Sequence, residues 1–191
     1  MKKGKLIIFS APSGAGKTTI VHHLLKTFPD KIAFSISATT RQARGNEQHE
    51  KDYYFVTKDE FLHKVAKHEF AEFEEVYSGT FYGTLKSEIQ TIWDEGKTVI
   101  FDLDVEGGLR LKKKYDADAL AIFVEPPSLE VLIERLNKRG TDSAEKIKER
   151  INKAEKELSY ASKFDVILEN NKLDDACSKA EEIILKFMNK K

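Results

Sequence analysis

The sequence predicts an α/β fold in which helices cover both faces of a parallel sheet. Short apolar runs without polar alternation, at residues 6–9, 98–103 and 120–124, are typical of central strands that are covered on both sides. Helical patterns separate these runs, and such alternation implies right-handed crossover connections. At 191 residues, with 40% hydrophobic and 34% charged residues, the chain is expected to form a single domain, 1–191.

The elements follow one another along the chain. Residues 6–9 predict a buried strand, because the run is short and is closed by Pro12 and Gly14. Residues 18–28 predict a helix, residues 32–39 a second strand and residues 166–168 the last strand. The other helices follow from apolar residues at helical spacing. These are Leu85, Ile89, Ile92 and Trp93; Leu129, Leu132, Ile133 and Leu136; Ile147, Ile151, Ala154 and Leu158; and Ile183, Ile184 and Phe187.

One region breaks the alternation. Residues 41–82 are polar, aromatic and rich in turns, with short strands expected at 54–56 and 70–76 around a helix near 59–66. We interpret this region, taken as about 41–84, as a substrate lobe inserted into a core of about 1–40 and 97–191.

The charges and the cysteine content exclude several classes of protein. Thirty-two basic residues balance thirty-two acidic ones, so we expect neither nucleic acid nor a membrane as partner, and any phosphate site must be local. The single cysteine, Cys177, excludes an internal disulfide and is expected to pack in the core. The five histidines lack metal-ligand spacing. The first apolar run is too short for a secretory or membrane segment, which predicts a cytoplasmic location.

A glycine-rich loop follows the first strand. Residues 11–18 read APSGAGKT, which differs from the phosphate-loop pattern G-x-x-x-x-G-K-[ST] in having Ala11 at the first position. Backbone N–H groups and the positive end of the next helix can surround a polyphosphate there, which predicts a core of the P-loop NTPase type. Lys17 would reach the β and γ phosphates, and the Thr18 hydroxyl would bind Mg²⁺. The residues expected at this triphosphate site are Pro12, Ser13, Gly14, Ala15, Gly16, Lys17, Thr18 and Thr19.

Two later segments make the sequence more specific. Residues 37–47 read SATTRQARGNE, and residues 51–55 read KDYYF. Here the chain resembles guanylate kinases, whose S-x-x-T-T-R-x-x-R-x-x-E and D-Y-x-F patterns stand at this distance after the loop. The resemblance covers nearly the whole chain. It implies phosphorylation of GMP to GDP, and of dGMP likewise, with ATP as donor and Mg²⁺ as cofactor. It also places Asn170 or Asn171 at the adenine end of ATP.

Paired arginines are the candidate site for the acceptor phosphate. Guanidinium groups suit a doubly charged phosphate better than lysine does. The resemblance implies that the α-phosphate of GMP is held by Arg41, Arg44, Tyr53 and Tyr82, and Glu47 completes the family pattern. Taken singly, these residues are better explained as a solvated basic turn and packed tyrosines, and only together with the loop and the spacing do they favour a phosphate site.

The candidate base site follows from the edge of guanine. Its O6 acceptor and its N1 and N2 donors require hydroxyls and one carboxylate. Glu72 matches the base-binding carboxylate of the family, and Ser37 and Thr84 would supply the hydroxyls to O6. Glu74 and Glu75 lie close to Glu72 in the sequence, and either could be mistaken for the base-binding acid.

Two acids end the strand at 98–103. An apolar run that delivers Asp102 to the mouth of the sheet resembles a Walker B strand. In guanylate kinases the acids of this D-x-D segment serve the guanine nucleotide and the water shell of magnesium. The sequence does not divide these roles between Asp102 and Asp104, and Asp104 is alternatively the N-cap of a helix over 105–111.

Arginines gather near the predicted lid, at about 137–150. Phosphoryl transfer through a loose transition state requires cations around the migrating oxygens. Arg135 and Arg139 lie on one helical face, and Gly140 would allow the lid to move. The resemblance implies that the catalytic cations are Lys17, Arg41, Arg135, Arg139 and Arg150.

Two rival interpretations stay open at this level. A sugar-phosphate kinase of the same fold would keep the loop and change the acceptor lobe, which the retained Arg41, Arg44, Tyr53 and Glu72 disfavour. A guanylate-kinase-like module that binds protein without catalysis would usually have a damaged loop. The sequence does not distinguish a monomer from a homo-oligomer.

Overall fold

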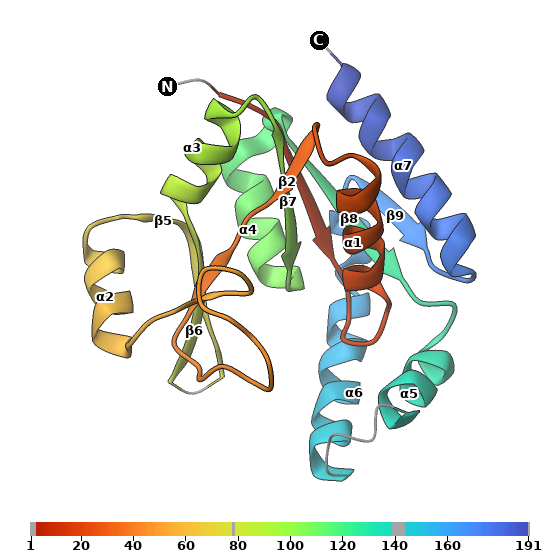
Figure 1. Cartoon of the computed structure of the whole chain (residues 1–191). Helices are drawn as coiled ribbons and strands as arrows, with labels where there is room; N and C mark the ends of the chain where they lie inside the picture. Colours follow the sequence, from red (N-terminus) through yellow and green to blue (C-terminus); the bar gives the residue numbers. More distant parts are fainter. Residues whose placement is uncertain (1–2, 78, 139–143, 191) are drawn as a thin grey trace.

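The computed structural model describes residues 3–77, 79–138 and 144–190 (Figure 1). Its core is a parallel sheet of five strands in the order β2-β7-β1-β8-β9. The strands are β1 (Leu6–Ser10), β2 (Ile32–Phe34), β7 (Thr98–Leu103), β8 (Ala119–Glu125) and β9 (Val166–Glu169). This architecture confirms the predicted α/β class with a helix-covered parallel sheet.

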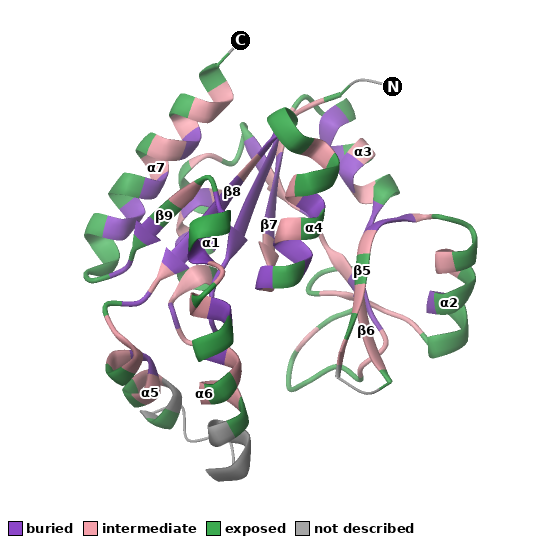
Figure 2. Cartoon of the chain, turned by 180° about the vertical axis from the view of Figure 1, so that it is seen from behind, coloured by how far each residue is buried: buried purple, intermediate pink, exposed green. Residues whose placement is uncertain are grey.

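Strand β1 shows why the core strands lack polar alternation. Its side chains alternate between two apolar clusters, one on each face of the sheet. Ile7 and Phe9 join the cluster formed with α1 (Lys17–Thr27) and α7 (Leu173–Asn189). Leu6 and Ile8 join the cluster formed with α3 (Lys86–Asp94) and α4 (Val105–Tyr115). Both faces are therefore dry, and Figure 2 shows the central strands as buried.

Helices α5 (Leu129–Lys138) and α6 (Ala144–Leu158) extend beyond the carboxyl ends of the core strands (Figure 1). Leu132 of α5 and Ala154 of α6 are buried in the same cluster as α1 and α7, which anchors both helices to the core. Short 3₁₀ turns, η1 (Asp116–Asp118) and η2 (Ala161–Lys163), precede β8 and β9. Among the described residues, no helix combines the length and hydrophobicity needed to cross a membrane.

A second sheet forms the lobe beside the core (Figure 1). Its order is β4-β3-β6-β5, with strands β3 (Ser37–Thr39), β4 (Tyr54–Phe55), β5 (Phe70–Tyr77) and β6 (Thr80–Leu85). Helix α2 (Lys58–Ala66), which begins with a capping box between Thr57 and Glu60, packs Phe61 against Phe70 with ring centroids 4.4 Å apart. This packing buries one face of the lobe sheet and leaves the other face for polar side chains.

The single strand predicted over 32–39 is wrong. The chain forms β2, leaves the core sheet after Phe34 and enters the lobe sheet at Ser37 as β3. The backbone N–H of Ser35 still donates to the carbonyl of Ile100, so the change of sheet occurs within two residues. Strand β6 was not among the expected elements.

The core packing expected for Cys177 is confirmed, since this residue of α7 is 6% exposed and belongs to the apolar cluster between α7 and the sheet.

Candidate active site

The glycine-rich loop between β1 and α1 is shaped by its backbone. Gly14 and Gly16 have φ angles of 94° and 92°, in the left-handed region that side chains disfavour, and the N–H of Ala15 donates to the carbonyl of Pro12 over 3.1 Å. Ala11 is 5% exposed and packs in the core, so its methyl group contributes to the core where the usual pattern has glycine. The loop leads directly into α1, whose first residues are Lys17 and Thr18.

Asn170 supports this loop from the end of β9. Its side chain is buried, and its Nδ2 donates to the carbonyl oxygen of Ala15 over 2.7 Å. A Cβ at Gly16 would collide with the same amide, so the loop glycine also makes room for Asn170. The neighbouring Asn171 is exposed and donates to Glu169. The structure thus places Asn170 on the loop backbone, while the contact with adenine stays a prediction.

Asp102 joins the end of β7 to the first turn of α1. Its carboxylate contacts the Lys17 ammonium and accepts a hydrogen bond of 2.6 Å from the Thr18 hydroxyl. Lys17 also donates to the carbonyl of Leu103 over 2.9 Å. Burial lowers the pKa of Lys17 from 10.5 to about 8, against the raising effect of the charges on Asp104 and Glu157. The lysine is therefore held at the loop before any phosphate binds.

Asp104 has a different position from Asp102. Its Oδ1 accepts the N–H of Gly107 over 3.0 Å, which makes it the N-cap of α4 and bears out the capping alternative. A Cβ at Gly107 would lie 2.6 Å from Asp104 Oδ1 and 3.2 Å from Glu72 Oε2. Glycine at this position lets the start of α4 approach the lobe, and the carboxylates of Asp104 and Glu72 flank it.

The polar face of the lobe sheet follows from strand register. Ser37 pairs with Thr84, and Thr84 pairs with Glu72, so these three residues form one row across β3, β6 and β5. Tyr82 occupies the next row on the same face, two residues along β6. Gly83 points to the opposite face, where a Cβ would lie 2.8 Å from the Phe70 ring. Packing against α2 on one face thus orients the polar row on the other.

The row distinguishes the neighbouring acids. Thr84 Oγ1 donates to Glu72 Oε1 over 2.9 Å, and the Glu72 side chain is 7% exposed. Burial raises the pKa of the Glu72 carboxyl, while the Thr84 hydrogen bond and the charge of Arg110 act in the opposite direction. Glu74 contacts Arg110, and Glu75 accepts the N–H of Gly79. Glu72 is therefore the acid that lies in one row with the two hydroxyls and contacts that of Thr84.

A second cluster surrounds the Arg41 guanidinium. Its two terminal nitrogens donate to Glu47 over 2.6 and 2.8 Å, and its Nε donates to the Tyr82 hydroxyl over 3.0 Å. The guanidinium carbon lies 4.7 Å from the centre of the Tyr53 ring. The hydrogen bonds from Arg41 lower the pKa of Glu47 to about 2. The Arg44 side chain is exposed, and its backbone N–H donates to Glu47.

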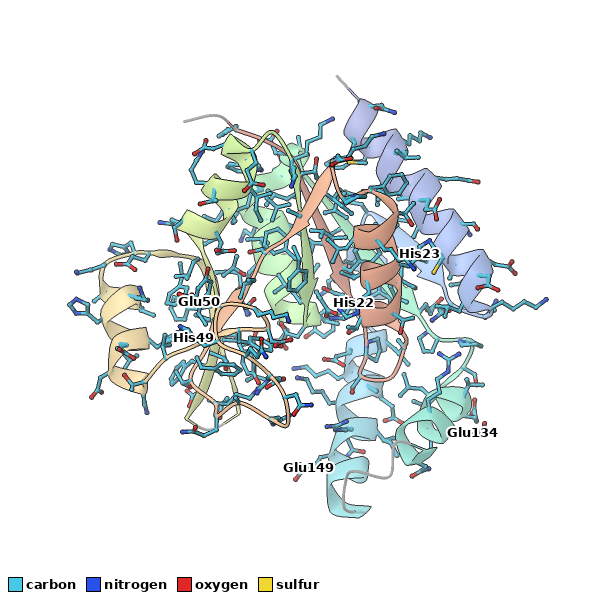
Figure 3. The ribbon with its side chains drawn as sticks, in the orientation of Figure 1. His22, His23, His49, Glu50, Glu134 and Glu149 are labelled. Carbon is cyan, nitrogen blue, oxygen red and sulfur yellow. The ribbon has the colours of Figure 1, made fainter. Side chains whose placement is uncertain are left out.

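The predicted lid is described in part. Arg135 lies on α5 and Arg150 on α6, and both are partly buried. Arg139 and Gly140 lie outside the described residues. Figure 3 labels Glu134 on α5 and Glu149 on α6, the residues that precede Arg135 and Arg150 in the sequence. The arrangement of the three arginines around a phosphoryl group therefore stays a prediction.

Two charged residues of the site, the buried Glu157 and the exposed Arg110, were missed at the sequence level. Glu157 of α6 is 8% exposed, and burial raises the pKa of its carboxyl to about 7. Its carboxylate lies 3.7 Å from the Lys153 ammonium and lines a small cavity together with Asp104. Arg110 of α4 reaches the lobe acids. A glutamate beside the apolar residues Ala154 and Leu158 was a signal for Glu157, whereas Arg110 gave none.

The described residues contain no group of three or more His, Cys, Asp or Glu side chains that could hold a metal ion by themselves. Figure 3 shows that His22 and His23 extend from α1 and His49 from the lobe. His23 pairs with Glu181 of α7 over 2.6 Å. A metal at this site would have to take ligands from a substrate or from water in addition to the protein.

Comparison with known proteins shows the family to which the chain belongs. The family model described as guanylate kinase matches residues 3–187. The chain is 50% identical to the guanylate kinase of Bacteroides thetaiotaomicron over 187 residues, which is 98% of this chain and 91% of that protein. It is also 50% identical to the guanylate kinase of Porphyromonas gingivalis, covering 97% and 99% of the two chains.

Solved structures agree with these relatives. The crystal structure of guanylate kinase from Anaplasma phagocytophilum superposes with a TM-score of 0.76 at 26% identity, covering 100% of this chain and 89% of that one. The family model and the relatives span both the core and the lobe, so the match includes the loop and the polar row alike. By sequence and by fold, the chain belongs to the guanylate kinase family.

Proposed function

We propose that this protein transfers the γ-phosphoryl group of ATP to GMP, and to dGMP, forming ADP and GDP or dGDP. The observation that carries the proposal is the row of Ser37, Thr84 and Glu72 on the same lobe face as Tyr82 and Arg41. Two residues of extended strand span about 7 Å, which suits a nucleotide with its base at Thr84 and its phosphate at Tyr82.

Recognition of guanine follows from donors and acceptors. The ionised Glu72 carboxylate can accept hydrogen bonds from N1–H and N2–H. The hydroxyl of Ser37 would donate to O6, and that of Thr84 would do so after rotating away from Glu72. Adenine would present an acceptor at N1 and a donor at N6, which leaves these buried groups unpaired. Such mismatches discriminate by about four orders of magnitude in sites built for hydrogen bonding.

The acceptor phosphate would bind at Arg41. Its guanidinium is already stacked on Tyr53 and hydrogen bonded to Tyr82, so little side-chain freedom is lost when the phosphate binds. Glu47 accepts from both terminal nitrogens and fixes the orientation of the guanidinium plane. Arg44, exposed beside it, would complete the charge around the phosphate.

The donor would bind with its phosphates on the loop backbone. Lys17 would leave Asp102 for the β and γ phosphates, and Arg135, Arg139 and Arg150 would surround the migrating group. The attacking oxygen belongs to an acceptor phosphate that is already ionised, so the reaction requires alignment and positive charge rather than a strong base. Closure of the lid would exclude water, the competing acceptor.

The oxygens at the loop fit a magnesium ion. Mg²⁺ prefers oxygen ligands, keeps several of its waters and binds through one or two carboxylates together with substrate phosphates. The Thr18 hydroxyl and the Asp102 carboxylate lie 2.6 Å apart at the start of α1, where the donor phosphates would end. The ion would neutralise charge on the phosphates.

We place the activity in the cytoplasm, where its nucleotide substrates are found.

A coupled assay with ATP·Mg²⁺ and each of GMP, dGMP, AMP, CMP and UMP tests the proposal. Turnover is expected with GMP and dGMP, with kcat/KM at least about a thousandfold higher than with AMP. Glu72→Gln should remove most of this preference, because an amide cannot accept from both guanine donors. Equal turnover of AMP and GMP by the unmodified protein would contradict the assignment of the row.

A further inference from the structure

One face of α4 is turned toward the lobe strand β5. Gly107, Arg110 and Lys114 follow one another on this face at helical spacing. Lys114 Nζ donates to the carbonyl of Ala71 over 2.7 Å, and the absence of a side chain at Gly107 lets Glu72 approach. Arg110 lies between these two contacts. The helix therefore presents a basic surface to the strand that carries the candidate base-reading acid.

Arg110 contacts two acids of β5. Its Nη2 donates to Glu74 Oε2 and lies 3.7 Å from Glu72 Oε2. The side chain of Glu72 is 7% exposed and that of Glu74 is 18% exposed, whereas that of Arg110 is 41% exposed. The guanidinium thus approaches the buried carboxylates from the solvent side of the cleft.

The surroundings of Glu72 are otherwise acidic. Glu74 lies on its own strand, and Asp104 lies at the N-terminus of α4. Positive charges come from Arg110 and Lys114 of α4, and the Thr84 hydroxyl of β6 donates a hydrogen bond. Three carboxylates in one partly dry region repel one another, so one of them becomes protonated unless a cation is close.

The protonation of Glu72 matters for the base. As an ionised carboxylate it can accept from both N1–H and N2–H of guanine, whereas a protonated carboxyl loses one acceptor and directs a donor at another donor. Burial alone favours the protonated form. A residue that keeps the acid ionised would therefore determine how well guanine is bound, without touching the nucleotide.

We propose that Arg110 is the positioning residue for guanine recognition: by binding Glu74 and placing its charge beside Glu72, it keeps Glu72 ionised and directed at the acceptor base. The inference rests on the proposed function, because it concerns how the same site selects GMP. The direction of the electrostatics agrees with it, since burial raises the pKa of Glu72 and the charge of Arg110 opposes that rise.

The test compares Arg110→Gln and Arg110→Lys with the unmodified enzyme. For Arg110→Gln we expect KM for GMP to rise by up to about tenfold on the acid side of the pH profile, with kcat and KM for ATP changed less than about twofold. The acid limb of kcat/KM for GMP should move to higher pH by about one unit. Arg110→Lys retains the charge and should recover most of both effects.

Lys113→Gln is the matched control, since it removes one positive charge from the same helix at an exposed position. It should leave the acid limb where the unmodified enzyme has it. Glu74→Gln separates the two acids: the amide oxygen can still accept from Arg110 and keep it beside Glu72, so the shift caused by Arg110→Gln should persist, at reduced size, in the Glu74→Gln background if it acts through Glu72. Thermal unfolding of each variant shows whether the fold is retained.

The outcomes are distinct. If the unmodified enzyme does not phosphorylate GMP, the proposed function fails. If it does, and Arg110→Gln leaves both KM for GMP and the acid limb unchanged, the role of Arg110 is wrong. A shift that disappears in the Glu74→Gln background, or one that Lys113→Gln reproduces, would equally overturn it.

Discussion

The two halves of the site are built in different ways. The loop half is the glycine-rich backbone between the buried strand β1 and helix α1. The Asn170 amide holds this loop through its hydrogen bond to the Ala15 carbonyl. The lobe half is made of side chains on one face of a small sheet whose other face packs on α2. Figure 2 shows this contrast, with the core strands buried and the lobe strands largely of intermediate burial.

The difference explains what each half tolerates. Backbone N–H groups bind a polyphosphate whatever the side chains are, so the loop accepts Ala11 in place of the usual glycine. The lobe has no such freedom, because discrimination between bases depends on which side chain donates and which accepts. Its charges also have internal partners, such as Arg41 with Glu47, which orient them before a substrate arrives.

The largest effect is expected at the loop. Lys17→Met should lower kcat by about a thousandfold or more, because it removes the cation that we propose lies at the transferred phosphate. GMP affinity, measured by calorimetry, should change less than about twofold if the halves are independent. Lys26→Met, which removes an exposed lysine from the last turn of the same helix, should leave kcat nearly unchanged. A large loss of GMP affinity in Lys17→Met would show that the two halves of the site are not independent.

The corresponding change in the lobe is Arg41→Gln. It removes the charged partner that we propose for the acceptor phosphate, and hydrogen bonds to charged groups contribute about 1.5–3 kcal/mol each, so KM for GMP should rise about 10- to 100-fold. Steady-state kinetics at saturating ATP measures this, and KM for ATP should stay within about twofold. An unchanged KM for GMP would show that the Arg41 cluster only stabilises the lobe.

Glu157 of α6 offers a test at the small cavity that it lines together with Asp104 and Glu74. Its folded pKa of about 7 lies above the ordinary 4.5, so the folded state binds more protons than the unfolded state and loses stability as pH rises between these values. Glu157→Gln should therefore raise the free energy of unfolding by up to about 3 kcal/mol at pH 8 and by little at pH 4. Urea unfolding at both pH values measures the difference. A variant that is destabilised at pH 8 would contradict this interpretation of the buried acid.

The smallest effect concerns the charge of Lys17. With its pKa lowered to about 8, the lysine is partly neutral in mildly alkaline solution, and a bound polyphosphate favours the charged form. ATP binding should therefore take up protons near pH 8, and ATP affinity should fall as pH rises further, by up to tenfold per unit. Calorimetry in buffers of different ionisation enthalpy detects the uptake. GMP binding near pH 8, which involves Arg41 instead, should show much less of it.

Much of the architecture could be predicted because it is local. The run at residues 6–9, the turn at Gly14 and Gly16 and the helix after them each depend on neighbours in the chain, and these elements are confirmed. The strand over 32–39 was wrong because its apolar pattern does not break where the chain changes sheets. The strand that pairs with Ser37 is β6, which lies far along the sequence, so neighbouring residues do not reveal the change of sheet.

What the sequence determined by itself, then, is the order of buried strands and helices, the loop between β1 and α1 and the family to which the chain belongs, since periodicity and motif spacing are properties of adjacent residues. The tertiary structure alone decided that Asn170 lies on the loop, that Glu157 is buried and that Arg110 faces Glu72. The reason is physical: burial and the approach of charges on separate elements arise only when the elements pack together.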